Sequence, residues 1–207
     1  MSASWKELKS ALEQAQGLLC RSLGRYIGAD PLGHFDINVQ RKISRRRALG
    51  AVGSFDAWKD RISLNLDDDV LGTAVHELLH ANAFSDDWTP ADLGRAGDMV
   101  SFRGLEIQLV SPGGRRVRQI LHRGINEAVT ELLTLHVYPR AIPAYASLLP
   151  CARKLLRSLG FDDLARAYFW GGYPALDQMA DAASLDLNLL DARSERILRG
   201  DHPKRGS

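Results

Sequence analysis

The stretch Thr73-Ala74-Val75-His76-Glu77-Leu78-Leu79-His80 decides how the rest of this chain is interpreted. Its apolar residues recur at helical spacing within residues 70–84, which predicts a helix with a buried face. Aspartates at positions 67–69 precede it and are suited to cap its first turn. Residues four apart on a helix lie one above the other, with Cβ atoms about 5–6 Å apart, so His76 and His80 are able to reach one metal ion.

Glu77 follows the first histidine directly, which places it beside a bound ion but not among its ligands. In the pattern His-Glu-x-x-His, a carboxylate at this position accepts a proton from water and later passes it to a leaving amine. The alternative is a helix that carries two core or solvent-facing histidines at the same spacing. The pattern therefore favours a zinc site, and a third ligand has to come from elsewhere in the chain.

A second predicted helix, over residues 125–137 and closed by Pro139, supplies that ligand. Glu127 and Glu131 are four apart and share one face of it. A catalytic zinc takes three protein ligands and keeps a fourth position open, and a carboxylate is a usual third ligand, so we expect Glu127 to bind the ion. Glu131 is then placed to accept the outward N–H of His76, which would orient the ring and raise its basicity. The alternative is a solvated acidic face.

The flanking segments predict an α+β fold. We expect an N-terminal helix over residues 5–25, a small antiparallel sheet beside the histidine-bearing helix, and a mainly helical C-terminal half. The predicted sheet contains strands at residues 35–39 and 61–66, with Gly50 and Gly53 between them. The segment from Ser85 to Met99 is interpreted as turn-rich. The remaining elements are a hairpin of residues 105–110 and 117–121, and helices at 141–159, 161–169, 174–183 and 187–198.

We expect one domain over residues 1–199, followed by a frayed tail at 200–207. Within it, residues 1–100 hold the sheet and the His-Glu-x-x-His helix, and residues 101–199 hold the hairpin, the glutamate-bearing helix and the C-terminal helices. A hydrophobic fraction of 45% is enough to form a core without a metal, so any bound metal is expected to serve chemistry.

Net charge is +2, from 27 basic and 25 acidic residues, which gives no strong field to attract nucleic acid or an anionic membrane. Neither partner is expected. Cys20 and Cys151 lie far apart and are expected to be buried free thiols. The first ten residues lack the pattern of a secretion signal and no apolar run is long enough to span a bilayer, so we expect a cytoplasmic protein. Export without a cleaved signal would leave no trace in these residues, and they do not reveal the oligomeric state.

These two helices make the chain similar to the gluzincin metallopeptidases, the thermolysin-like class. In that class His-Glu-x-x-His is followed by a helix bearing Asn-Glu-x-x-x-Asp or a close variant. This chain has Asn126-Glu127, and Glu131 stands where the pattern prefers aspartate. The matching residues cover the two helices and, more loosely, the predicted strand at 61–66, which resembles the cleft-edge strand of the class. The short chain is most similar to the small single-domain minigluzincins.

The resemblance implies a zincin-like fold and one catalytic Zn²⁺. It assigns the roles as follows: His76, His80 and Glu127 are ligands, Glu77 is the general base, and Glu131 and Asn126 support the ligands. The stretch between His80 and Glu127 is longer than in the compact members and contains the predicted hairpin, which bears on the shape of the cleft. The larger members also use a His or Tyr to stabilise the oxyanion, and by position the candidates here are Tyr145, Tyr138 and His122, with Tyr145 preferred.

The function implied is that of a zinc-dependent endopeptidase acting on a peptide or protein substrate. The alternative from another class is a non-catalytic zinc-containing binding or regulatory module on the same scaffold. Glu77 argues against that alternative, because a structural zinc has no use for a base beside its ligands. A third possibility, a helical protein with a chance motif, predicts that the purified chain contains no stoichiometric zinc.

Overall fold

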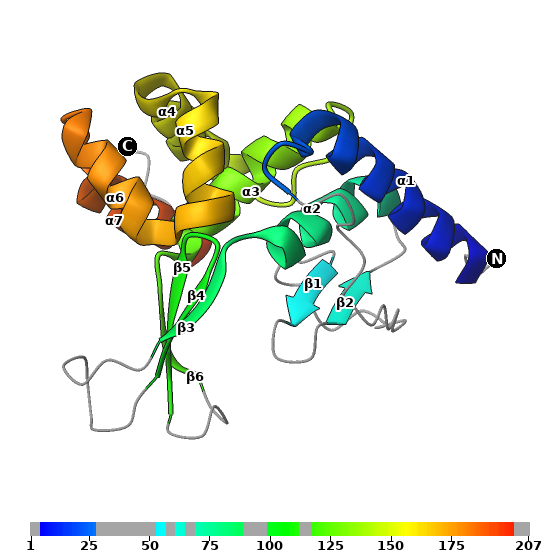
Figure 1. The fold of residues 1–207 in the computed structure, drawn as a ribbon, viewed down its shortest axis with the longest axis horizontal. Coiled ribbons are helices and arrows are strands. Elements are labelled where there is room, and N and C mark those ends of the chain that lie inside the picture. Colours follow the sequence, from blue (N-terminus) through cyan, green and yellow to red (C-terminus); the bar gives the residue numbers. More distant parts are fainter. Residues whose placement is uncertain are drawn as a thin grey trace, which may run out of the picture. The chain divides into compact units, whose positions relative to one another are not determined.

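The structure is a computed structural model that describes residues 5–27, 53–56, 61–64, 69–88, 99–111 and 117–200 (Figure 1). The chain divides into two compact units. Unit 1 comprises Met1–Asn82 and Thr130–Ala146, and unit 2 comprises Ala83–Val129 and Ser147–Ser207. The boundary falls within helix α3 (Arg123–Val137). The prediction of one domain over residues 1–199 stays a prediction, and the predicted tail lies almost wholly outside the described residues.

In unit 1, helix α1 (Trp5–Leu23) packs against helix α2 (Val70–Asn82). The buried side chains of α1 follow helical spacing, which explains why this segment forms an amphipathic helix: Leu8, Leu12, Ala15, Leu19 and Leu23. Residues 72–79 of α2 are all buried, and α1, β1 and β2 all contact this helix. Both helices confirm the elements predicted from periodicity.

Strands β1 (Gly53–Asp56) and β2 (Arg61–Leu64) form an antiparallel pair, and both contact α2. Strand β2 confirms the prediction for residues 61–64. Its partner differs from the prediction, because Gly53 was expected between strands but pairs with Leu64 in β1. Four residues that include a glycine are too short to show alternation. The strand predicted at residues 35–39 lies outside the described residues.

Unit 2 contains a four-stranded antiparallel sheet in the order β3 (Ser85–Trp88), β4 (Met99–Arg103), β5 (Glu106–Val110) and β6 (Val117–Leu121). The β5–β6 pairing confirms the predicted hairpin. The interpretation of residues 85–99 as turns was wrong for residues 85–88, which pair with β4, and for Met99, where β4 begins. The sequence Ser-Asp-Asp-Trp lacks the alternating apolar residues that identify a strand, and backbone pairing with β4 forms the strand nonetheless.

The C-terminal part of unit 2 is helical, with α4 (Leu149–Leu159), α5 (Phe161–Arg166), α6 (Gly172–Ala182) and α7 (Leu187–Leu198). A π-helical turn, η3 (Ala167–Gly171), joins α5 to α6. The helix predicted over residues 141–159 begins only at Leu149, after a 3-10 turn, η2 (Ala146–Leu148). Prolines at positions 143 and 150 explain the late start, because proline belongs to the first turn of a helix.

The fold is α+β, as predicted at that level, with a small antiparallel sheet and a helical C-terminal part. Among the described helices, none combines the length and the apolar character needed to cross a membrane. Both cysteines are free. Cys151 is buried as predicted, and burial raises the pKa of its thiol, whereas Cys20 is only partly buried.

Candidate metal site

Helix α2 brings the two histidines of the motif together. The Nε2 atoms of His76 and His80 lie 3.1 Å apart, and the rings meet edge to face with centroids 4.8 Å apart. His76 and Glu77 are both buried, and His80 is partly exposed. The four-residue spacing therefore has the predicted consequence, since both imidazoles direct a nitrogen to the same point.

Helix α3 supplies the carboxylate. Glu127 is buried, and one ligand atom from each of His76, His80 and Glu127 lies within 4.8 Å of the other two. Among the described residues this is the group of histidine, cysteine and acidic side chains that could hold a metal ion. The structure thus brings together the three residues that the sequence selected as ligands.

The spacing of these donors fits a zinc ion. The two Nε2 atoms are 3.1 Å apart. If each lies about 2.05 Å from a zinc ion, the N–Zn–N angle is about 98°, close to the tetrahedral value of about 109°. Two imidazoles and one carboxylate are also a usual donor set for catalytic zinc.

Glu131 lies one turn after Glu127 on α3, beside His76. Its Oε1 is 3.8 Å from His76 Nδ1, the ring nitrogen that does not face His80. The same oxygen accepts the backbone N–H of Tyr145 at 2.9 Å. The side chain is 1% exposed, so its charge acts on the histidine with little screening by water. This placement is the one expected for a carboxylate that orients a liganding imidazole.

Of the three oxyanion candidates, Tyr145 lies next to a predicted ligand. Its ring centroid is 6.2 Å from that of His76, and its backbone is held by Glu131. Tyr138 donates its backbone N–H to Thr134 and so extends α3 by one residue. His122 packs elsewhere, as described below. The preference for Tyr145 is therefore consistent with its position, although its role stays a prediction.

Asn126 has a contact that sequence reasoning did not foresee. Its side chain is buried, and its Oδ1 accepts the backbone N–H of Leu105 at 3.0 Å. Leu105 follows Gly104, which has a φ of 60° in the turn between β4 and β5. Residues 21 positions apart have no local signal that would reveal this hydrogen bond. Asn126 thus ties the helix that carries Glu127 to the sheet of unit 2.

Two further contacts near the site were missed. Arg123 Nε lies 3.8 Å from Glu127 Oε1, one turn earlier on α3, and the spacing of four was the available signal. Asp69 caps α2, because its Oδ1 accepts the N–H of Gly72 at 2.9 Å, and its Oδ2 accepts the N–H of Ile142 at 2.8 Å. The cap was predicted among the aspartates at 67–69, and the second contact was not. Asp69 therefore links the start of α2 to the segment that leads to Tyr145.

Comparison of the chain with protein-family models, with curated proteins and with solved structures found no match. No relative therefore suggests a function for this chain. The case for a function therefore depends on the chemistry of the described side chains, above all on the three ligand atoms that converge from α2 and α3.

Proposed function

We propose that this chain is a zinc-dependent endopeptidase on a zincin-like scaffold of the gluzincin type. In this proposal His76, His80 and Glu127 hold one Zn²⁺, and Glu77 is the general base. The observation that supports it is the convergence of two imidazole nitrogens and one carboxylate within 4.8 Å, on the helix that also carries Glu77. The donor set and the adjacent base together are typical of a hydrolytic zinc site.

A zinc ion in this site supplies Lewis acidity and makes water acidic enough to lose a proton near neutral pH. Glu77 accepts that proton and returns it to the amine that leaves. Its side chain is buried, which keeps the carboxylate away from bulk water, and it follows His76 directly on α2. Glu131 Oε1 lies 3.8 Å from His76 Nδ1 and is proposed to orient that ring. The Tyr145 hydroxyl is proposed to donate a hydrogen bond to the oxyanion that forms at the substrate carbonyl.

The proposed substrate is a peptide or protein in an extended conformation. Strand β2 pairs with β1, and no second partner strand for it is found within the described ranges. Both strands contact α2, the helix that carries the motif. We propose that a substrate strand adds to an edge of this sheet through backbone hydrogen bonds, which would present its carbonyl groups to Glu77.

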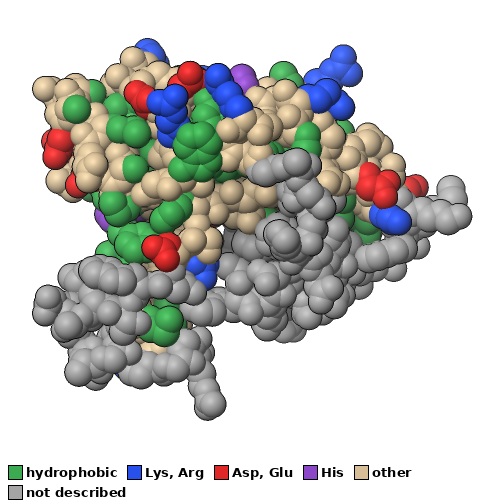
Figure 2. Space-filling view, viewed as in Figure 1, with side chains coloured by type: hydrophobic (Ala, Val, Ile, Leu, Met, Phe, Trp, Pro, Cys, Tyr) green, Lys and Arg blue, Asp and Glu red, His purple; other side chains and the backbone are tan. Residues whose placement is uncertain are grey.

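Nucleic acid and membranes are not proposed as partners. On the face drawn in Figure 2, basic and acidic side chains lie among each other over the described part, in keeping with the near balance of charge in the sequence. A surface of this kind does not select a polyanion. The cytoplasmic location expected from the sequence stays part of the proposal.

Two measurements on the purified chain test the proposed function. Metal analysis should find close to one zinc per chain, whereas a protein with a chance motif would contain none. Cleavage of a peptide library should then separate the peptidase from a non-catalytic zinc module. Glu77→Gln should keep its zinc and lose cleavage, because an amide binds no proton at neutral pH.

The matched control is Glu13→Gln, the same change at a side chain of α1 that is 62% exposed. It should cleave the library at the wild-type rate. Wild-type cleavage by Glu77→Gln would refute the role of this residue. Stoichiometric zinc without cleavage by the wild-type chain would favour the binding module instead.

A further inference from the structure

The first turn of α3, which directly precedes Glu127, is held by side chains that the metal-site motif does not include. Glu127 lies four residues after Arg123, where α3 begins. Residues 122, 124 and 126 each make a hydrogen bond to another element of unit 2. Because a helical turn is a stiff unit, whatever holds these residues also sets the position of the Glu127 backbone, from which its carboxylate reaches the proposed ion.

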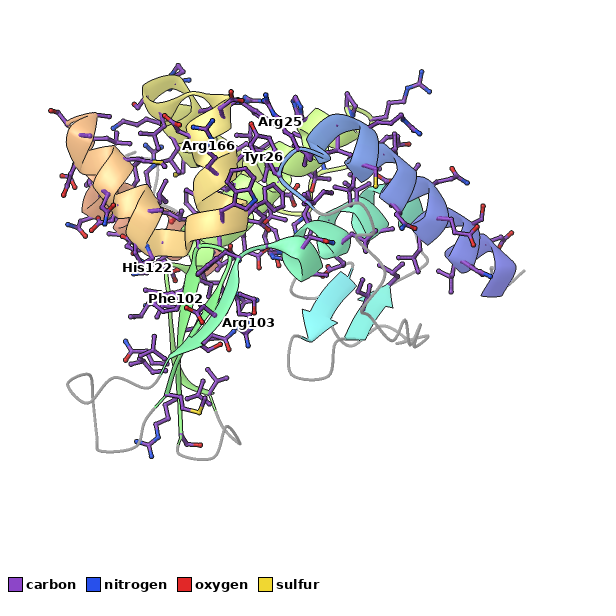
Figure 3. All side chains as sticks on the ribbon, in the orientation of Figure 1. Arg25, Tyr26, Phe102, Arg103, His122 and Arg166 are labelled. Carbon is purple, nitrogen blue, oxygen red and sulfur yellow. The ribbon has the colours of Figure 1, made fainter. Side chains whose placement is uncertain are left out.

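His122 joins β6 to α3 and is labelled in Figure 3. Its φ of 60° is in the left-handed region, which few residues with a side chain adopt. Its ring Nδ1 lies 2.7 Å from Asp191 Oδ2 on α7, and the ring stacks on Tyr173 of α6 at 3.5 Å. Its carbonyl accepts the N–H of Asn126, a hydrogen bond of the first turn of α3. His122 therefore ties the start of α3 to two other helices.

Gly124 is in direct backbone contact with α7. Its N–H donates to Glu195 Oε1 at 2.6 Å. A Cβ at this position would lie 2.5 Å from the carbonyl carbon of Ser194 and 2.7 Å from the nitrogen of Glu195. Only glycine allows so close an approach of the two backbones. The distance between α3 and α7 is thus determined by the absence of a side chain at residue 124.

We propose that α7 positions the metal ligand Glu127, with Glu195 as the principal positioning residue and His122 and Asp191 as its support. Glu195 lies 68 residues after Glu127 in the sequence, yet it accepts a hydrogen bond from Gly124, in the helical turn that directly precedes Glu127. Asn126 joins the same turn to Leu105 through a second hydrogen bond. The inference rests on the proposed metal site. According to this inference, loss of the α7 contacts leaves α3 folded but displaces the Glu127 carboxylate from the ion.

Titration with Co²⁺, a coloured substitute for Zn²⁺, tests this inference without measuring catalysis. Glu195→Ala removes the acceptor for Gly124, and we expect Co²⁺ affinity to fall about tenfold, as for other residues that orient a ligand. The visible absorption bands should shift, because they report the geometry of the ligands. Glu195→Gln should restore both the affinity and the spectrum, since its amide oxygen accepts the same hydrogen bond.

The control is Asn188→Ala, at an exposed residue of α7, which should match the wild-type chain. If Glu195→Ala does not fold, as judged by circular dichroism, His122→Gly is the second variant. Glycine adopts a φ of 60° without strain, so this variant keeps the backbone while it loses the contacts with Asp191 and Tyr173.

The outcomes separate the inference from the proposed function. Wild-type affinity and spectrum in Glu195→Ala, or in His122→Gly where that variant is used, would overturn the role of α7 and leave the metal site in place. A lower melting temperature alone, with an unchanged spectrum, would have the same meaning. Failure of the wild-type chain to bind Co²⁺ or Zn²⁺ would overturn both.

Discussion

Glu131→Gln separates the charge of this buried side chain from its hydrogen bond. The amide oxygen of glutamine is still able to accept the Tyr145 N–H, at present a 2.9 Å contact, whereas the negative charge 3.8 Å from His76 Nδ1 is lost. Loss of a group that orients a liganding histidine weakens metal binding by about 10–100-fold. Because 3.8 Å is longer than a hydrogen bond between these two atoms, we expect the lower end, about tenfold or about 1.4 kcal/mol.

Glu131→Ala is the companion variant. It removes the charge and also the acceptor for the Tyr145 N–H, and it leaves a cavity because the side chain is 1% exposed. An amide left without its partner costs about 1–3 kcal/mol of unfolding free energy, to which the cavity adds. We therefore expect both variants to bind metal more weakly, and only the alanine variant to lose much stability.

Competition with a chromophoric chelator measures the zinc affinity, and urea unfolding of the metal-free chains measures the stability. The expected pattern is a tenfold loss of affinity with little change of unfolding free energy in Glu131→Gln. A glutamine variant that binds zinc within about twofold of the wild-type affinity would show that the carboxylate does not act on His76. Equal losses of stability in both variants would show that the charge, and not the Tyr145 hydrogen bond, stabilises the fold.

Two further predictions concern unit 2. Gly104→Ala should lower the unfolding free energy by about 1–3 kcal/mol in urea titrations, because φ is 60° and a Cβ would lie 2.6 Å from Asn126 Oδ1; an unchanged midpoint would contradict this. Burial, with a contribution from Asp191, raises the pKa of Tyr173 above its ordinary 10.0, so the fold favours the neutral phenol. The stability that this shift contributes is fully present below pH 10 and is lost as the pH rises further. Tyr173→Phe removes the titrating group, so its unfolding free energy should fall less between pH 9 and pH 11 than that of the wild-type chain.

The helices of the site were predictable because each carries its own pattern. The helical spacing of apolar residues identified α2 and α3, and the four-residue spacing of His76 and His80 fixed which side chains share a face. Strand β3 could not be found in the same way. Its sequence alternates no apolar residues, and it exists because β4 offers it a backbone partner. A strand of this kind is a property of the assembled sheet and not of its own residues.

The same distinction applies within the site. The three candidate ligands could be selected from residue type and spacing, since metal chemistry restricts both. The contacts that support them could not. Asp69 binds the N–H of Ile142, 73 residues later, and Glu195 binds that of Gly124, 71 residues earlier. A carboxylate has no preference in sequence for a particular backbone N–H, so such partners become visible only once the chain is folded.

Helix α3 carries two acidic side chains with different proposed roles. Glu127 is a predicted metal ligand, and Glu131 lies beside Nδ1 of the predicted ligand His76. Inserting or deleting one residue between them would turn everything downstream by about 100° and shift it by about 1.5 Å along the axis. Either glutamate would then face the wrong way. The four-residue interval in α3 therefore tolerates exchange of residues but no change in their number.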